Sequence, residues 1–168
     1  MLEVEVVGVR IELPSNQPLV LLKETEGERH IPIWIGAPEA SAIAFAQQGI
    51  KPPRPMTHDL LCSVVRELDR TITEVRLVSV QDTVFYAELV FDGGQTVSSR
   101  ASDAIAVALR VPCPIYCAEE VMEEAGVQIA EASEEEEGEA GPAEENAESQ
   151  LREFREFLAD VEPEDFEK

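Results

Sequence analysis

Basic side chains are scarce in this sequence. Its 168 residues include 13 Lys and Arg against 35 Asp and Glu, so the formal net charge at pH 7 is −22. Residues 131–168 contain 16 of the acidic residues and three of the basic ones, which leaves residues 1–130 with a net charge of −9. Tight binding to nucleic acid without sequence preference normally needs a broad basic surface. The composition disfavours such binding and leaves room only for a small, local basic site.

Long apolar runs are also absent. No run approaches the roughly 18 residues that indicate a membrane-spanning helix. The first residues, MLEVEVVGVRIE, have neither a basic start nor a long apolar centre, so they do not resemble a secretory signal peptide. We therefore expect a cytoplasmic protein without a membrane association.

Cysteine is rare as well, with only Cys62, Cys113 and Cys117 present. The last two are separated by three residues, a spacing that fits neither a redox CxxC motif nor a paired zinc knuckle. A buried cysteine often behaves as a small apolar residue. We expect all three cysteines to be reduced and structural.

Alternation of apolar and polar residues predicts two groups of β-strands. Leu2, Val4 and Val6 alternate with acidic residues, and the strands LVLLKET and RHIPIWIG follow after short links. ITEVRLVSV, VFYAELVF and QTVSS form the second group, in which Asp92 and Gly93 mark a hairpin turn. Short links of this kind favour an antiparallel meander in each group, and PIYCA is a further short strand.

Three helices and one shorter helix, EEVMEEAG, are predicted between and after these strands. APEASAIAFAQQG has Pro38 in its first turn and Gly49 at its end. THDLLCSVVRELD and SDAIAVALR begin with Thr57 and Ser102 as N-caps. The fold class expected is α+β, with a mixed, largely antiparallel sheet from two meanders packed with three or four helices. The core-facing stripe expected on the second helix is Leu61, Val64, Val65 and Leu68.

The composition changes near residue 131, which predicts three parts. Residues 1–130 form the folded domain. Residues 131–149 lack large apolar side chains and are expected to be a disordered acidic linker. Residues 150–168 contain a short amphipathic helix that docks on the domain, on another subunit or on a protein partner. Its apolar stripe is Leu151, Phe154, Leu158 and Val161.

The starts of the three longer helices carry groups that suit a phosphate ligand. A helix N-terminus presents free N–H groups and a positive partial charge to an anion. Arginine binds a phosphate with two hydrogen bonds, and an arginine precedes two of these helix starts. The candidate phosphate-binding residues are Arg54, Thr57, Arg100 and Ser102.

Acidic side chains occur at the same three helix starts. Carboxylates that keep some bound water suit Mg²⁺, and a divalent ion beside a phosphate assists its hydrolysis. A nearby histidine can transfer the proton. If the helix starts meet, they predict a Mg²⁺ or Mn²⁺ site of Glu39, Asp59 and Asp103, with His58, Asp59 and Asp103 as the catalytic residues.

Each of these residues also has an ordinary structural explanation. An acid in the first turn stabilises a helix by ~0.3–1 kcal/mol through the helix dipole, and Ser and Thr are common N-caps. Neither His30 nor His58 has a partner at the HxxxH spacing of a metal site. The residues alone support an α+β domain with a pocket for an anionic ligand.

Three sequence blocks follow one another: HIPIWIGAPEASAIAFAQQG, then RPMTHDLL, then SRASDAIAVALRVPCPIY. In this order and spacing they resemble the bifunctional nuclease domain family, and the resemblance covers roughly residues 1–130. It implies an α+β fold with a mixed sheet, nuclease activity on DNA and RNA, and homo-oligomers. The positions inside the matching blocks are Glu39, Arg54, Thr57, His58, Asp59, Arg100, Ser102 and Asp103.

Two functional hypotheses follow from these observations. The first is a nuclease that hydrolyses phosphodiester bonds with metal assistance and binds nucleic acid only weakly at a local site. The alternative is a non-enzymatic binding or regulatory module for a protein partner or a small anionic ligand. The acidic body and tail favour the alternative, and the resemblance favours the nuclease.

Overall fold

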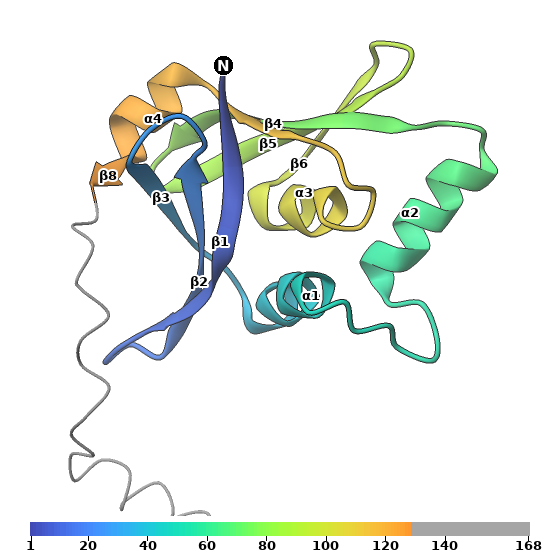
Figure 1. Ribbon diagram of the computed structural model, residues 1–168, viewed down its shortest axis with the longest axis horizontal. Helices are drawn as coiled ribbons and strands as arrows, with labels where there is room; N and C mark the ends of the chain where they lie inside the picture. The colour runs from blue at the N-terminus through green and yellow to red at the C-terminus, as the bar shows by residue number, and fades with distance from the viewer. Residues whose placement is uncertain (129–168) are drawn as a thin grey trace, which may run out of the picture. The chain divides into compact units, whose positions relative to one another are not determined.

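The computed structural model describes residues 1–128, which form eight strands and four helices (Figure 1). The linker and terminal helix predicted for residues 131–168 lie outside this range. The elements, in chain order, are β1 Leu2–Glu12, β2 Gln17–Glu24, β3 Arg29–Trp34, α1 Ala37–Gln47, α2 Thr57–Glu67, β4 Ile72–Gln81, β5 Val84–Phe91, β6 Thr96–Arg100, α3 Ala101–Ala108, β7 Ile115–Cys117, α4 Glu119–Ala125 and β8 Val127–Gln128.

All eight strands belong to one mixed sheet with the order β6-β5-β4-β7-β1-β2-β3-β8. The first three strands form one antiparallel meander and β4, β5 and β6 form another. The short strand β7 joins them, because Ile115 pairs with Val4 of β1 and with Val75 of β4. Only the β4–β7 pairing within residues 1–128 is parallel. The predicted fold class is therefore confirmed.

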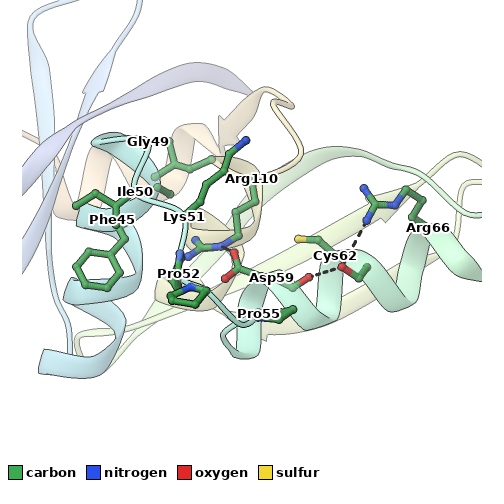
Figure 2. A pocket seen from close by; sticks show the side chains of 14 residues that line it. Phe45, Gly49, Ile50, Lys51, Pro52, Pro55, Asp59, Cys62, Arg66 and Arg110 are labelled. Atoms are coloured by element: carbon green, nitrogen blue, oxygen red, sulfur yellow. Dashed lines mark hydrogen bonds and ion pairs between the residues drawn. The ribbon is translucent and has the colours of Figure 1, made fainter.

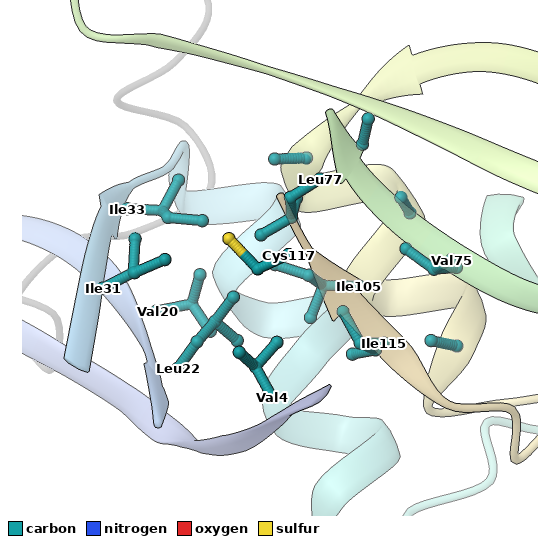
Figure 3. Packing of buried hydrophobic residues seen from close by; sticks show 14 of the residues in the cluster. Val4, Val20, Leu22, Ile31, Ile33, Val75, Leu77, Ile105, Ile115 and Cys117 are labelled. Carbon is teal, nitrogen blue, oxygen red and sulfur yellow. The ribbon is translucent and has the colours of Figure 1, made fainter. Parts of the chain in front are cut away.

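The core lies between this sheet and the helices, and α3 is its most buried element (Figure 3). Every residue of α3 except Asp103 is buried. Four of its residues are alanines, and such small side chains let the helix approach its neighbours closely. Ile105 points into the cluster with Leu77 and Ile31, and all three are fully buried. The burial of α3 fixes the position of its first turn, where Asp103 alone remains accessible.

The core-facing stripe predicted on α2 is wrong for most of its members. No residue of α2 is buried, and Leu61, Val64 and Leu68 are 39%, 46% and 69% exposed. Val65 alone of the four packs partly against the core. The proline-rich segment before α2 carries it away from α1, so that it stands apart at the side of the molecule (Figure 1). The periodicity of apolar residues identified the amphipathic helix, but it does not tell whether the same chain provides a surface that packs against its apolar stripe.

The predicted N-caps are also corrected. α2 begins at Thr57 itself, and its start is held by the Asp59 carboxylate, which accepts a hydrogen bond of 3.0 Å from the N–H of Met56. α3 begins at Ala101, so Ser102 lies inside the helix and is buried. In both cases the helix starts one or two residues earlier than the hydroxyl suggests. None of the helices within residues 1–128 has the length and apolar content needed to cross a bilayer.

We expect Leu77→Ala to lower the free energy of unfolding by about 2–5 kcal/mol, because it leaves a cavity in the packed core. Leu77 has no exposed surface, whereas Leu60 on α2 is 55% exposed. The matched variant Leu60→Ala should change stability by less than about 0.5 kcal/mol. Urea unfolding followed by circular dichroism measures both, and equal losses would contradict the packing described.

Candidate functional site

Four polar side chains from the starts of α1, α2 and α3 form one cluster. Asp103 accepts hydrogen bonds from Arg100, with Nε 2.7 Å from Oδ2 and Nη2 3.1 Å from Oδ1. Nε2 of His58 lies 2.9 Å from Oδ1 of the same carboxylate. Nη2 of Arg100 also donates to Oε1 of Glu39 over 2.9 Å. The condition set in the sequence analysis, that the helix starts meet, is therefore fulfilled for Glu39, His58, Arg100 and Asp103.

The fold places each member of the cluster through a different element. Arg100 ends β6 and directly precedes α3, so it is held by pairing with Tyr86 of β5. Asp103 occupies the first turn of α3, which also packs beside α1 and α2. Glu39 and His58 lie in the first turns of those two helices. Residues far apart in the sequence therefore meet because three helices begin on the same side of the sheet.

Burial and charge act on Asp103 in opposite directions. Its side chain is 30% exposed, and this burial alone would raise its pKa. The hydrogen bonds from Arg100 and His58 outweigh the burial and hold the pKa of Asp103 below its ordinary value of 3.8. The pKa of Arg100 is raised, mainly by its hydrogen bond to Asp103. Both groups are therefore charged at neutral pH.

The cluster lies at the wall of a pocket of about 660 Å³, a volume within the usual range for small-ligand sites. His58 is 13% exposed and Glu39 is 17% exposed, whereas the guanidinium-bearing side chain of Arg100 is 67% exposed. Ser99 also lines the pocket, and its Oγ is buried without a hydrogen-bond partner among residues 1–128. The remaining wall is largely apolar and includes Leu61, Val65, Leu89, Phe91, Val97 and Val107.

Asp59 belongs to a different cluster. Its Oδ1 accepts a hydrogen bond of 2.6 Å from Nε of Arg110, and its Oδ2 accepts the N–H of Met56. Burial alone would raise the pKa of Asp59, but these hydrogen bonds hold it below the ordinary value. Arg110 also donates to the carbonyls of Ala106 and Ala42, over 2.7 and 3.1 Å. This arginine links α1, α2 and α3, and Asp59 faces a second pocket (Figure 2).

Sequence reasoning missed Arg110. The only available signal was a basic residue just after the last turn of α3, where it complements the helix dipole. That signal identifies a helix end but not a partner on another helix. Arg110 is 10% exposed, and its hydrogen bonds to two helices other than its own arise only from tertiary packing.

The predicted phosphate-binding residues are divided by the fold. Arg100 and Thr57 line the pocket that contains the Asp103 cluster. Arg54 is exposed in the segment between α1 and α2 and lines neither pocket. Ser102 is buried in α3 and does not line the pocket either.

The predicted metal ligands are likewise separated. In the part of the chain that the structure describes, no three His, Cys, Asp or Glu side chains are grouped closely enough to hold a metal ion. Glu39 and Asp103 remain near each other, joined by the guanidinium of Arg100. Mg²⁺ commonly uses one or two carboxylates and completes its shell with water and substrate phosphates. Glu39 and Asp103 have the ligand chemistry of such a donor set, but both bind Arg100 in this structure, and Asp59 lies in another cluster.

Comparison with known proteins gives matches to most of the chain. A family model described as "Bifunctional nuclease domain" matches residues 20–130. Two proteins of Mycobacterium tuberculosis are each 49% identical over 164 residues, covering 98% of this chain and 97% of the relative. They are "Uncharacterized protein MT1877" of strain CDC 1551 / Oshkosh and "Uncharacterized protein Rv1829" of strain ATCC 25618 / H37Rv. The family match includes all four residues of the Asp103 cluster.

The low pKa of Asp103 predicts a loss of stability in acid. A carboxyl group whose pKa is lower in the folded protein than in the unfolded chain stabilises the fold above its unfolded pKa, and this contribution disappears as the pH falls through the folded value. We therefore expect Asp103→Asn to lose less stability than the wild type between about pH 5 and pH 2. The control Glu67→Gln changes an exposed residue outside the ion pairs of residues 1–128. Identical acid unfolding of Asp103→Asn and the wild type would contradict this assignment.

The Asp59–Arg110 pair predicts a structural effect. Asp59→Asn removes the charge that compensates a nearly buried arginine, so we expect a loss of about 1–3 kcal/mol in unfolding free energy. Asp92 forms a comparable but more exposed pair with Arg70, and Asp92→Asn should cost no more than about 1 kcal/mol. Chemical unfolding at pH 7 compares the two variants, and an equal cost would contradict the linking role of Arg110.

Proposed function

The chain belongs to the bifunctional nuclease domain family, and from this premise we propose that it hydrolyses phosphodiester bonds of DNA or RNA. The proposed site is the cluster of Glu39, His58, Arg100 and Asp103. The observation that carries the proposal is that one carboxylate, Asp103, binds both a histidine and an exposed arginine at the wall of a pocket. Proton transfer and phosphate binding are thereby available in the same place.

His58 is the proposed proton-transfer group. A carboxylate that accepts a hydrogen bond from an imidazole orients the ring and fixes its tautomer. Asp103 holds Nε2 of His58, which leaves Nδ1 for proton exchange with water or the leaving oxygen. Asp103 thus acts as the residue that orients the proposed acid or base.

Arg100 is the proposed phosphate-binding residue. Its side chain is largely exposed, and a guanidinium can exchange carboxylate partners for phosphate oxygens in the same bidentate arrangement. Glu39 and Asp103 together carry one more negative charge than Arg100 compensates, so a bound cation would favour the approach of a phosphodiester. Mg²⁺ or Mn²⁺ bound by Glu39 and Asp103 would neutralise phosphate charge and lower the pKa of a bound water.

The substrate proposed for this pocket is a single strand. Its wall combines Phe91 with aliphatic side chains such as Leu61 and Val97. Unstacked bases bind apolar and aromatic surfaces, whereas a duplex keeps its bases inside. The net charge of the chain is strongly negative, so binding would depend on this local site rather than on a broad surface. Such substrates agree with the cytoplasmic location expected from the sequence.

Self-association is part of the proposal. Leu60, Val64 and Leu68 expose an apolar strip on α2, as an unpartnered interface does. We propose that the protein forms homo-oligomers through such a surface. A protein partner for residues 150–168 remains a separate proposal, because those residues lie outside the described range.

A binding module without catalysis is the second candidate. The observation that favours it is that Arg100 already satisfies both carboxylates, so the cluster also serves as a tie between three helix starts. In that case a protein partner or a small anionic ligand would occupy the pocket. Removing the Asp103 carboxylate would then change ligand binding or stability, and no catalytic activity would be present in the wild type or the variant.

We expect the wild type to cleave end-labelled single-stranded RNA or DNA in Mg²⁺ or Mn²⁺ and to stop in EDTA. His58→Ala and Asp103→Ala should each lower the rate at least ~100-fold, because positioned acid–base catalysis contributes that much or more. Asp92→Ala is the matched control, since Asp92 also pairs with an arginine but lines neither pocket.

The controls decide between the two candidates. Equal cleavage by the wild type and Asp103→Ala, prepared identically, would indicate a contaminating nuclease and contradict the proposal. Full activity in EDTA would contradict the proposed requirement for a divalent metal ion. An absence of cleavage under all these conditions would favour the binding module.

A further inference from the structure

A second pocket, of about 520 Å³, lies on the other side of α2 (Figure 2). It is formed by the end of α1, the segment between α1 and α2, one face of α2 and the end of α3. Three prolines of that segment line it, and proline restricts the backbone, so this wall is rigid before any ligand binds. The residues with polar or reactive groups in its wall are Lys51, Asp59, Cys62, Ser63, Arg66 and Arg110.

The charge of this pocket is opposite to that of the chain. Arg110 and Asp59 compensate each other. Lys51 and Arg66 form no ion pair within residues 1–128, and the only side-chain hydrogen bond of Arg66 is a long one of 3.4 Å to Ser63. The wall therefore has two uncompensated positive charges in a chain of net charge −22.

The basic side chains that form no ion pair are concentrated in one part of the domain. Residues 1–128 contain ten Lys and Arg, and five of them form ion pairs with acidic side chains. Of the other five, Lys51, Arg54 and Arg66 belong to α2 or to the segment that leads into it. The remaining two, Arg10 and Lys23, lie on β1 and β2 and line neither pocket.

The uncharged part of the pocket wall suits a ligand that has an apolar face next to its charged group. Phe45, Ile50 and Leu109 line the pocket together with the prolines, and Ser63 offers a hydroxyl. Two cations next to such a surface match a phosphate joined to a sugar and base. A bare anion would leave the apolar wall without a contact.

The two pockets are neighbours across α2. Successive residues of a helix point about 100° apart because each turn contains 3.6 residues. His58 accordingly lines the pocket of the Asp103 cluster, whereas Asp59 lines the second pocket. The first turn of α2 separates the pockets, so a ligand crossing that turn would contact both.

We propose that the second pocket binds the phosphate of a nucleotide through Lys51 and Arg66. The ligand is either a free nucleotide or a nucleotide of a strand that has another of its phosphates at Arg100. The second source rests on the proposed nuclease function, whereas phosphate binding at Lys51 and Arg66 does not.

The test uses the full chain and a double variant, Lys51→Gln with Arg66→Gln. Its matched control, Arg10→Gln with Lys23→Gln, removes the same charge from two other cations without ion pairs. One probe is a fluorescein-labelled 12-nucleotide single-stranded DNA, followed by anisotropy in EDTA over a range of salt. The other is adenosine 5′-monophosphate, followed by calorimetry. Thermal melts confirm that both double variants remain folded.

We expect the pocket variant to weaken DNA binding about tenfold and to lower the salt slope by about 0.7, since each neutralised phosphate of a single strand contributes about that much. The control should change the affinity less than twofold. A loss of DNA binding alone identifies the strand as the source, and a loss of monophosphate binding identifies the free nucleotide. If both double variants bind both probes equally, the proposal is overturned.

These outcomes are independent of catalysis. Binding is measured without cleavage, so a protein that fails the nuclease assay can still bind nucleotide phosphate at Lys51 and Arg66. Conversely, the protein could be an active nuclease in which the Lys51→Gln, Arg66→Gln variant binds and cleaves like the control. That result would contradict phosphate binding in the second pocket and would not affect the proposed catalytic site at Asp103.

Discussion

The burial of α3 is the constraint on which the rest of the site depends. Its alanine-rich surface packs beneath the sheet and beside α1, and only Asp103 in its first turn remains accessible. The buried helix cannot shift without opening the core, so the carboxylate has a fixed position. Arg100 before it, and His58 and Glu39 from the neighbouring helices, are then oriented by hydrogen bonds to that fixed group or to its arginine.

The helix α2 separates two environments of opposite charge. One of its faces borders the acid-rich cluster of Asp103, and the other borders a wall with Lys51 and Arg66. The Asp59–Arg110 pair between α2 and α3 helps to keep the helix in this position, because α2 has no fully buried residue and only Cys62 and Val65 pack partly against the core. Because most of its surface is not covered by the core, α2 can present two of its faces to ligands.

Much of the fold could be predicted from local patterns, because alternation and turn residues specify the two meanders. The helix starts identified Glu39, His58, Arg100 and Asp103 as candidates, but whether these residues meet depends on tertiary packing and could not be predicted from local patterns. The role of Asp59 could not be predicted, since its partner Arg110 is 51 residues away in the sequence. The exposure of α2 was missed because an amphipathic stripe does not specify which surface covers it.

The most direct test of the central claim compares two aspartates of neighbouring helix starts. Unfolding free energy at pH 7 and the rate of single-strand cleavage should be measured side by side for Asp103→Asn and Asp59→Asn. The account predicts that Asp103→Asn loses at least ~100-fold in rate with a small change in stability, because the Arg100 side chain that it pairs with is 67% exposed. Asp59→Asn should lose more stability and keep its rate while folded. The opposite pattern, or equal losses in both properties, would contradict the assignment of Asp103 to the chemistry.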